Sequence, residues 1–269
     1  MNALKSFFRP LQPTIGTNHS RKVWYKEFQA SKDLEQYIFC YWELKSIALS
    51  KESFKYRVVS DGCVDILVDV KEGEIFITGF SKQYLEYDLG TSFHYVGIRF
   101  YPFMFPLLFG ISAEKVINKF LKLEYLLPTL SSTIKYQLAE RVNTNRLQDL
   151  LGEVLISYID KEKDLSSFDP RFSNAVDQIL KSGGNTPINQ LDIALSQRQL
   201  RRFFQFYFGK SPKVFAKIFR FQNILNAKPS IQSLKSEKVF YDKGYYDQAH
   251  FIKDFKRFYG VTPSEAFGR

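Results

Sequence analysis

Cysteine and histidine are scarce in this sequence of 269 residues. The two cysteines, Cys40 and Cys63, have no partner at CxxC spacing, so neither a disulfide framework nor a thiolate metal site is predicted. Among the three histidines only His94 lies within an expected strand, whereas a metal-dependent enzyme needs several such ligands in one place. These shortages predict reduced, buried cysteines and no metal, cofactor or catalytic centre.

Long hydrophobic runs are also missing. No stretch of about 18 uncharged apolar residues occurs, and the segment from Met1 to Pro13 has no apolar stretch of signal-peptide length. We therefore expect a cytoplasmic chain that does not enter a membrane. With 45% apolar and 25% charged residues, the chain has enough hydrophobic surface for a folded core.

The net charge of +10 is distributed unevenly along the chain. Residues 168–269 hold 17 Lys and Arg against 8 Asp and Glu, whereas residues 1–167 hold 21 against 20. A compact basic segment behind a nearly neutral one indicates an anionic polymer or membrane surface as the partner of the basic segment.

Short segments rich in aromatic and β-branched residues, separated by turn signals, follow one another up to Phe100. We expect strands over 23–28, 38–44, 56–60, 63–70, 75–78, 84–87 and 94–100. Asp61-Gly62 and Lys71-Glu72-Gly73 are the clearest turns, because glycine adopts the positive φ that tight connections need. Strands of this length and spacing indicate a small barrel or sandwich.

Helical periods replace the strand pattern after Pro102. Apolar residues recur on one helical face from Leu147 to Tyr158, and a polar stretch over 161–167 marks a boundary. We expect an α+β chain of two domains. Residues 1–164 would form a β-rich domain with following helices, and residues 168–269 would form an all-α domain.

An internal repeat lies within the expected helical domain. Five positions recur at a displacement of 51 residues: Ser196, Leu200, Phe204, Gly209 and Pro212 return as Asp247, Phe251, Phe255, Gly260 and Pro263. Each unit has an N-cap residue, apolar residues four apart, a glycine that ends the helix and a proline that starts the next. Capping boxes are expected at Ser196 with Gln199 and at Thr262 with Glu265.

The repeat predicts two helix-turn-helix motifs. Their second helices would run over about 196–208 and 247–259, preceded by supporting helices over 188–193 and about 235–243. On a helical wheel the apolar residues of each second helix share one face, and the opposite faces are cationic. These cationic faces hold Arg198, Arg201 and Arg202 in the first helix, and His250, Lys253, Lys256 and Arg257 in the second. Such faces have the chemistry needed to read a major groove.

Residues 172–267 resemble the DNA-binding domain of AraC/XylS regulators, in which a long helix joins two helix-turn-helix units. In the first unit the matching residues are Ser196, Arg198, Leu200, Arg202, Phe204, Gly209, Ser211 and Pro212. In the second unit they are the run 244–251 (Gly-Tyr-Tyr-Asp-Gln-Ala-His-Phe), Phe255, Lys256, Gly260, Thr262 and Pro263. The linker helix would run from Pro212 to about Asn226.

The resemblance implies a sequence-specific regulator of transcription, of bacterial type and not an enzyme, whose helices enter successive major-groove segments of double-stranded DNA. The base-reading residues would be Arg198, Arg201, Arg202, Gln248, Ala249, His250 and Lys253. The phosphate contacts would be Ser196, Lys210, Ser211, Lys256 and Arg257. The sequence departs from the family at Asp192 and Phe240, where a small alanine is usual, and its first supporting helix is short.

Residues 28–127 resemble an uncharacterised domain that often precedes such DNA-binding domains. The resemblance rests on Tyr41-Trp42, on 57–59 with 61–65, and on 97–102. It implies a sensing or oligomerisation domain, with a small-molecule effector, a second copy of the chain and RNA polymerase as candidate partners. The candidate effector-pocket residues are Trp42, Asp65 and Arg99. Asp65 and Arg99 would form either a buried ion pair or an anchor for an acidic effector.

Two other functions are compatible with the sequence. One is an architectural DNA-binding protein without effector control, and the other is a small-molecule enzyme with a DNA-targeting tail. Footprinting separates the regulator from the architectural protein, because the latter protects DNA with little sequence preference. Turnover of a small molecule would support the enzyme.

Overall fold

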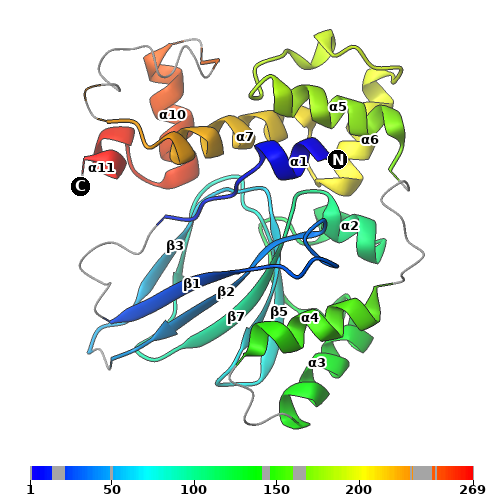
Figure 1. Cartoon of the computed structure of the whole chain (residues 1–269). Coiled ribbons are helices and arrows are strands. Elements are labelled where there is room, and N and C mark those ends of the chain that lie inside the picture. Colours follow the sequence, from blue (N-terminus) through cyan, green and yellow to red (C-terminus); the bar gives the residue numbers. More distant parts are fainter. Residues whose placement is uncertain are drawn as a thin grey trace.

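The computed structural model of the chain describes residues 2–13, 22–48, 51–140, 146–159, 168–230, 232, 244–245 and 247–268. Residues 22–159, here the sheet half, contain the strands and a few helices (Figure 1). Residues 168–268, here the helical half, lie along one side of the sheet half (Figure 1). The expected α+β class, with strands first and helices after them, is confirmed.

An antiparallel sheet of six strands, in the order β1-β2-β7-β4-β5-β8, forms the centre of the sheet half. Its strands are β1 (Val23–Gln29), β2 (Ile38–Ser46), β4 (Val64–Asp69), β5 (Glu74–Gly79), β7 (His94–Phe100) and β8 (Phe120–Lys122). A separate two-stranded ribbon pairs β3 (Lys55–Val58) with β6 (Leu85–Asp88). Successive side chains of a strand point to opposite faces, so one face of β4 and β7 carries the apolar pairs Ile66–Ile98 and Val68–Val96, and the other face carries Asp65 beside Arg99.

The apolar face of the sheet packs against helices. Ile66, Ile98 and Phe100 on this face join the main hydrophobic core. The helices of the sheet half are α2 (Met104–Phe109), α3 (Pro128–Glu140) and α4 (Leu147–Tyr158), with 3₁₀ turns η1 (Ala113–Lys115) and η2 (Leu123–Tyr125). The opposite face carries Trp42 and a smaller core cluster, and the β3–β6 ribbon lies over it.

Seven strands lie where the sequence predicts them, within two residues at each end. The exception is β8, which the sequence analysis did not predict. Its segment is short, follows Lys119 and ends in Lys122, and Asn118 before it adopts a left-handed φ of 53°. Such a segment has the composition of a loop, and its pairing with β5 supplies the strand geometry.

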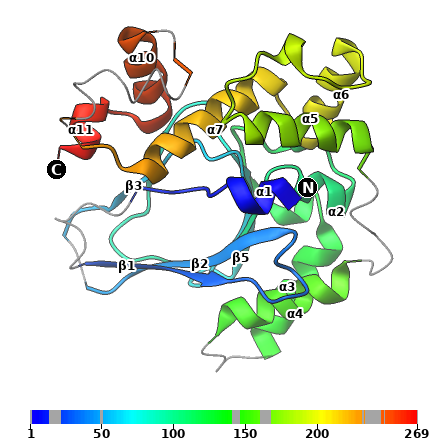
Figure 2. The same ribbon diagram turned by 45° about the horizontal axis from the view of Figure 1, so that its top comes forward.

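The helical half contains α5 (Pro170–Lys181), η4 (Ile188–Gln190), α6 (Gln197–Tyr207), α7 (Pro212–Ala227), α10 (Gln248–Tyr259) and α11 (Pro263–Phe267). Helices α6 and α10 lie at opposite ends of the connecting helix α7 (Figures 1 and 2). The helix expected over about 235–243, with Phe240, lies outside the described residues. None of the described helices has both the length and the apolar character needed to cross a lipid bilayer.

The expected supporting helix over 188–193 is wrong in extent, because only the 3₁₀ turn η4 forms there. Helix α5 provides the reason. The side-chain oxygen of Gln178 accepts from the backbone N–H of Asp192 at 3.0 Å, and its nitrogen donates to the carbonyl of Asp192 at 2.7 Å. Asn174 donates to the same carbonyl at 3.2 Å. These side chains satisfy backbone groups that a longer helix would have paired internally.

The first described residues of the chain pack on the helical half. Helix α1 (Asn2–Phe7) contacts α5, and the fully buried Phe8 stacks on Phe215 and Phe219 with ring centroids 6.2 and 5.8 Å apart. The backbone N–H of Leu11 donates to Gln222 at 2.7 Å, and Gln222 donates to the carbonyl of Leu11. The N-terminal segment therefore completes the core of the helical half.

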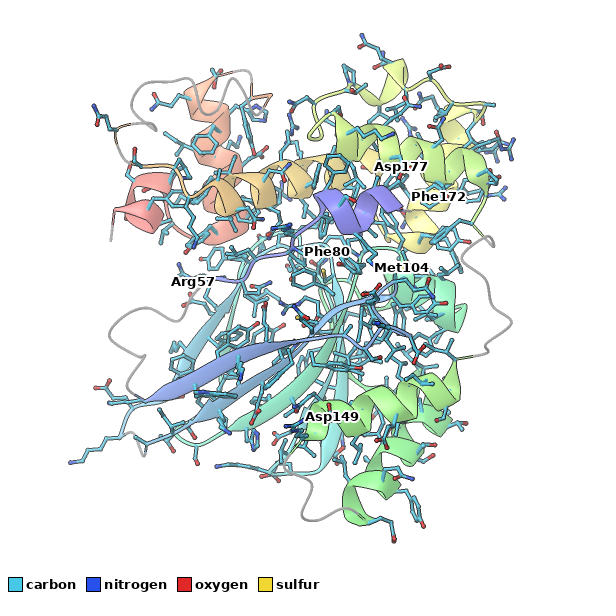
Figure 3. The ribbon with its side chains drawn as sticks, in the orientation of Figure 1. Arg57, Phe80, Met104, Asp149, Phe172 and Asp177 are labelled. Atoms are coloured by element: carbon cyan, nitrogen blue, oxygen red, sulfur yellow. The ribbon has the colours of Figure 1, made fainter. Side chains whose placement is uncertain are left out.

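Aromatic rings form the contact between the two halves. Phe103 packs among the rings of Phe172, Phe204, Phe208 and Phe215, with centroids 4.9–5.7 Å apart. Its own φ of 74° is in the left-handed region, which is costly for a residue with a bulky side chain. The packing of its ring offsets that cost. In Figure 3, Met104 lies on the sheet side of this contact and Phe172 on the helical side.

Phe8 and Phe7 provide a matched test of the N-terminal segment. Replacing the fully buried Phe8 by alanine should lower the free energy of unfolding by about 3–5 kcal/mol, because the cavity left under α7 cannot close. Phe7 is 46% exposed, so Phe7→Ala should change the free energy of unfolding by about 0.5 kcal/mol or less. Urea unfolding of the full chain measures both. Equal losses would show that Phe8 does not anchor the segment.

Candidate functional site

Helix α6 presents a basic face to solvent. The Ser196 hydroxyl accepts from the backbone N–H of Gln199, and the Gln199 side chain accepts from the backbone of Ser196, so the predicted capping box is confirmed. Leu200 and Phe204 are fully buried on the inner face. The side chains of Arg198, Arg201 and Arg202 are all exposed on the outer face.

Helix α10 repeats this arrangement. Asp247 caps its start by accepting from the backbone N–H of His250 at 2.7 Å, and Phe251 and Phe255 are buried on its inner face. Exposed polar and small residues cover the other face: Gln248, Ala249, Lys253, Lys256 and Arg257. The second capping box, at Thr262 with Glu265, also forms and starts α11. The repeat found in the sequence is thus a repeat of structure.

His250 differs from its neighbours because its ring is held in place. Its Nε2 lies 3.3 Å from the carboxylate of Asp254, one helical turn away, and its ring packs on Tyr245. Asp254 is only 5% exposed and also accepts from Nζ of Lys217 on α7 at 2.9 Å. Asp254 was not predicted from the sequence, although its i, i+4 spacing from His250 was a usable signal.

The glycines that end the two helices lie against the sheet half. Gly209 has φ 74° and Gly260 has φ 100°, values that favour glycine. A Cβ on Gly209 would collide with Ile117, and a Cβ on Gly260 would collide with the ring of Tyr84. The backbone N–H of Tyr84 also donates to the carbonyl of Arg257 at 3.1 Å. Both helix ends are therefore fixed on the same neighbouring half.

The remaining expected phosphate contacts lie between α6 and α7. Ser196 is exposed at the start of α6, and Ser211 is the half-buried N-cap residue of α7. Lys210 lies near Lys82 of the sheet half, and burial together with the charge of Lys82 lowers its pKa. Two lysines from different halves thus gather positive charge beside the turn that follows α6.

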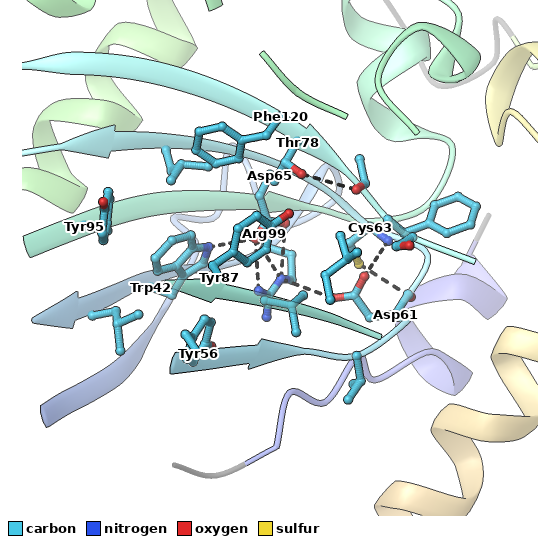
Figure 4. A pocket seen from close by; sticks show the side chains of 18 of the residues that line it. Trp42, Tyr56, Asp61, Cys63, Asp65, Thr78, Tyr87, Tyr95, Arg99 and Phe120 are labelled. Carbon is cyan, nitrogen blue, oxygen red and sulfur yellow. Dashed lines mark hydrogen bonds and ion pairs between the residues drawn. The ribbon is translucent and has the colours of Figure 1, made fainter. Parts of the chain in front are cut away.

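A cavity of about 240 Å³ lies between the sheet and the β3–β6 ribbon. Figure 4 shows aromatic side chains around it and a charged group at its floor. All three expected pocket residues, Trp42, Asp65 and Arg99, line it. Further lining residues include Tyr56, Asp61, Cys63, Phe80, Tyr87 and Phe120.

The charged group at the floor of the cavity is a buried ion pair. Arg99 is 4% exposed and donates from Nε and Nη2 to the carboxylate of Asp65 at 3.0–3.2 Å. Asp65 also accepts from the indole N–H of Trp42 at 2.9 Å. Asp61 lies 3.6 Å from Arg99 and accepts from Gln12 and from the backbone N–H of Cys63. The buried ion pair, one of the two alternatives given for Asp65 and Arg99, is present.

Asp61 was interpreted from the sequence as a turn residue only. Gly62 after it does have a positive φ of 80°, so the turn is real. Asp61 and Cys63, which precede β4, nevertheless line the cavity together with Asp65 of that strand. Burial raises the pKa of Cys63 and of Cys40, so both cysteines remain thiols, as expected of core residues.

Gly97 positions the indole of Trp42 in the cavity wall. A Cβ at residue 97 would overlap the indole ring, including its Nε1. Since residue 97 has no side chain, the indole lies flat over β7 and its N–H reaches Asp65.

The site geometry defines a class of protein. Two capped helices with exposed basic faces, at opposite ends of one connecting helix, are the arrangement of a double helix-turn-helix DNA-binding protein.

Comparisons with known proteins add the family. Residues 192–269 match a family described as a helix-turn-helix domain, and residues 26–122 match a domain of unknown function (DUF6597). The chain thus carries an AraC-type helix-turn-helix domain at its C-terminus behind a DUF6597 domain, which confirms the resemblance, and it is a DNA-binding regulator of transcription. A comparison with curated protein sequences gives no match.

Among solved structures, the chain is similar to ToxT from Vibrio cholerae O395, with 12% identity, a TM-score of 0.39, and coverage of 92% of this chain and 98% of that chain. A 1.65 Å structure of ToxT from Vibrio cholerae has 14% identity, a TM-score of 0.37 and the same coverage. ToxT from Vibrio cholerae strain SCE256, bound to an unsaturated fatty acid, has 13% identity and a TM-score of 0.36, and covers 91% of this chain and 93% of that chain.

Asp65 should titrate at an unusually high pH. Burial, which outweighs the opposing effect of Arg99, raises its pKa from 3.8 to about 6. In a Trp24→Phe variant, which leaves Trp42 as the single tryptophan, fluorescence should change with a midpoint near pH 6, and Asp65→Asn should remove the change. Because the folded-state pKa is the higher one, the stability that Asp65 contributes is fully present below about pH 4 and is lost as the pH rises through 6. A midpoint near pH 4 would contradict this assignment.

Proposed function

We propose that the chain regulates transcription by binding a specific double-stranded DNA sequence, with α6 and α10 in adjacent segments of the major groove. The observation that carries this proposal is the repeated geometry of the two helices. Each has a capped N-terminus, a buried aromatic face and an exposed basic face, and α7 holds the two apart. A single basic helix would be ordinary for a solvated surface, but two in structural register are what two successive grooves require.

Base reading is assigned to the exposed residues of the two outer faces: Arg198, Arg201 and Arg202 on α6, and Gln248, Ala249, His250 and Lys253 on α10. Arg donates to guanine O6 and N7 as a fork, and Gln pairs in a similar way with adenine. His250, held by Asp254, would offer its ring in one fixed orientation. Fixed side chains lose less entropy on binding than free ones.

Phosphate contacts are assigned to Ser196, Lys210, Ser211, Lys256 and Arg257. Lys82 of the sheet half lies near Lys210 and adds a charge that the sequence analysis did not include. The two lysines repel one another, so a phosphate bound between them would relieve that repulsion.

We propose the cavity of the sheet half as the effector site, with Trp42, Asp65 and Arg99 in its wall. Phe80 lines the cavity and stacks on Phe208, the residue at the end of α6, with ring centroids 4.5 Å apart. Figure 3 shows Phe80 at the edge of the sheet half nearest the helices. A ligand that moves Phe80 would therefore shift α6 relative to α10. We assign no catalytic activity to this site.

A second copy of the chain and RNA polymerase are the further partners that we propose. Tyr125 at the end of η2 and Tyr136 on α3 are 71% and 61% exposed and offer aromatic area. Helix α3 lies on the side of the sheet half that faces away from the helical half (Figure 1). Sedimentation of the full chain tests the self-association.

Selection from a random DNA pool, with the full chain at one stated salt concentration, tests the function itself. An enriched motif of two parts about 10 base pairs apart is the expected result. Binding without enrichment would contradict sequence-specific reading and would favour an architectural protein.

Arg202→Ala should weaken binding to the selected sequence by about 1–3 kcal/mol and relax specificity at one position, since a forked contact to guanine is lost. The matched control is Arg171→Ala on α5, which removes an arginine already paired with Asp169. Titration of single-base variants of the motif measures both effects. An unchanged affinity for the single-base variants would show that Arg202 does not read bases.

Lys256→Ala should weaken all DNA sequences about equally and lower the slope of log affinity against log salt by about one unit, as for one lost phosphate contact. Lys55→Ala changes an exposed lysine of β3, makes the same change of charge outside both helices and should leave the slope unaltered. A loss confined to particular sequences would mean that Lys256 reads bases.

A further inference from the structure

We propose that the segment joining β5 to β6 (residues 80–84, the β5–β6 connection) sets the separation of α6 and α10 and transmits filling of the cavity to these helices. Tyr84 is the residue of this segment that positions α10. The route rests on the proposed effector site and on the proposed DNA reading, and it joins the two.

The β5–β6 connection contacts both DNA-binding units. At its start, Phe80 stacks on Phe208 at the end of α6, with ring centroids 4.5 Å apart. At its end, the backbone N–H of Tyr84 donates to the carbonyl of Arg257 in the last turn of α10, at 3.1 Å. One short segment therefore meets the ends of both helices.

The ring of Tyr84 contacts both α10 and the β3–β6 ribbon. A Cβ on Gly260 would lie 2.9–3.0 Å from three carbons of this ring, so the backbone that ends α10 packs directly on it. The guanidinium of Arg57 on β3 lies over the same ring, 5.2 Å from its centroid. A cation is attracted to an aromatic face, so Arg57 keeps the ring of Tyr84 on the ribbon.

Hydrogen bonds fix the first part of the connection to the sheet. The backbone N–H of Asn118 donates to the carbonyl of Phe80 at 3.2 Å. The side-chain oxygen of Asn118 accepts from the hydroxyl of Ser81 and from the backbone N–H of Lys82, both at 3.1 Å. The hydroxyl of Ser60, which follows β3, donates to the carbonyl of Ser81 and ties the ribbon to the sheet at this point. Residues 80–82 therefore stay with the sheet, whereas Tyr84 belongs to the ribbon.

The two helices accordingly rest on different sides of the cavity. The turn after α6 lies against Ile117, and Val116 beside it accepts from the backbone N–H of Gly79 on β5 at 3.2 Å. The end of α10 lies against the ribbon, where the backbone N–H of Ser60 also donates to the carbonyl of Phe258 at 3.4 Å. A change in the distance between ribbon and sheet would therefore change the separation of α6 and α10.

The cavity lies where such a change can begin. Phe80, Ser81 and the adjoining Leu85 of β6 line it, as does Val58, the partner of Leu85 on β3. The ribbon is a separate two-stranded sheet, so among the described strands no backbone ladder fixes its distance from the larger sheet. A molecule that fills the cavity would press on the ribbon beside Tyr84 and move the end of α10.

Spin labels measure the separation of the two helices directly. Nitroxides on Arg201→Cys in α6 and Lys253→Cys in α10 are suitable, because both positions are exposed. The native Cys40 and Cys63 are buried and stay unlabelled. Double electron–electron resonance on the full chain gives the distribution of distances between the labels.

Tyr84→Ala should broaden this distribution, because the end of α10 loses the ring on which it packs. Tyr84→Phe keeps the ring and should leave the distribution unchanged. Tyr158→Ala removes a tyrosine of α4 that is 36% exposed, and this matched control should also change nothing.

Larger side chains in the cavity take the place of a ligand in the second measurement. Val58→Phe should push ribbon and sheet apart and shift the mean distance between the labels. In a chain that also carries Tyr84→Ala the shift should be absent, because the contact that moves α10 is gone. Leu85→Phe fills the cavity from β6 and serves the same purpose if Val58→Phe does not fold.

DNA binding gives a readout that a general loss of stability would not produce. Tyr84→Ala should lower the preference for the selected spacing of the two motif parts, over a spacing one base pair longer, by at least about twofold. The slope of log affinity against log salt should stay the same, because no phosphate contact is removed. Tyr84→Phe should keep the original preference.

Each contrary outcome overturns a defined part. An unchanged distance distribution in Tyr84→Ala would overturn the positioning role of Tyr84. No shift in the cavity-filling variants, or a shift that persists without the Tyr84 ring, would overturn transmission through the β5–β6 connection. A pool selection without an enriched motif would overturn the proposed DNA reading, while the distances between the labels would still decide this inference.

Discussion

The position of the two basic helices depends on aromatic packing between the halves of the chain. Phe103 enters a set of four rings from the helical half and accepts an unfavourable backbone conformation to do so. Phe80 adds a second stack, on Phe208 at the end of α6. Since aromatic contacts of this kind are directional as well as apolar, they fix an orientation and do not merely join two surfaces.

The turns after α6 and α10 extend this constraint to both DNA-binding units. Gly209 and Gly260 each lie so close to the sheet half that a methyl group would not fit. The separation of the two helices is therefore set twice, once by the length of α7 and once by the surface on which both helix ends lie. In the proposed mode of DNA binding, a site whose two parts have the matching spacing would need no rearrangement of the protein, whereas any other spacing would break one of these contacts.

Local signals made the DNA-binding elements predictable from sequence. The capping residues Ser196 and Thr262, the buried phenylalanines and the helix-ending glycines all act within a few residues, and each lies where the repeat indicated. The helix expected over 188–193 was wrong in extent because its end depends on a contact between residues that are distant in sequence. Gln178, fourteen residues before Asp192, supplies the hydrogen-bond partners that end the helix. The docking of Phe8 on α7 joins residues more than two hundred positions apart and has no local sequence signal. In the cavity, Asp65 and Arg99 were predicted from their charge in apolar strands. Asp61 was not predicted as a cavity residue, because the Asp61-Gly62 turn already accounted for an aspartate at that position.

The place of the N-terminal segment has a consequence for synthesis. Phe8 leaves the ribosome more than two hundred residues before its partners Phe215 and Phe219. During translation the sheet half can assemble from contacts that are close in sequence, while the ring of Phe8 in the N-terminal segment stays exposed to solvent. The core of the helical half is thus assembled from two segments that lie far apart in the sequence. A nascent chain in which α7 has not yet been made does not have a complete core around Phe8, so the N-terminal segment and the helical half become stable together.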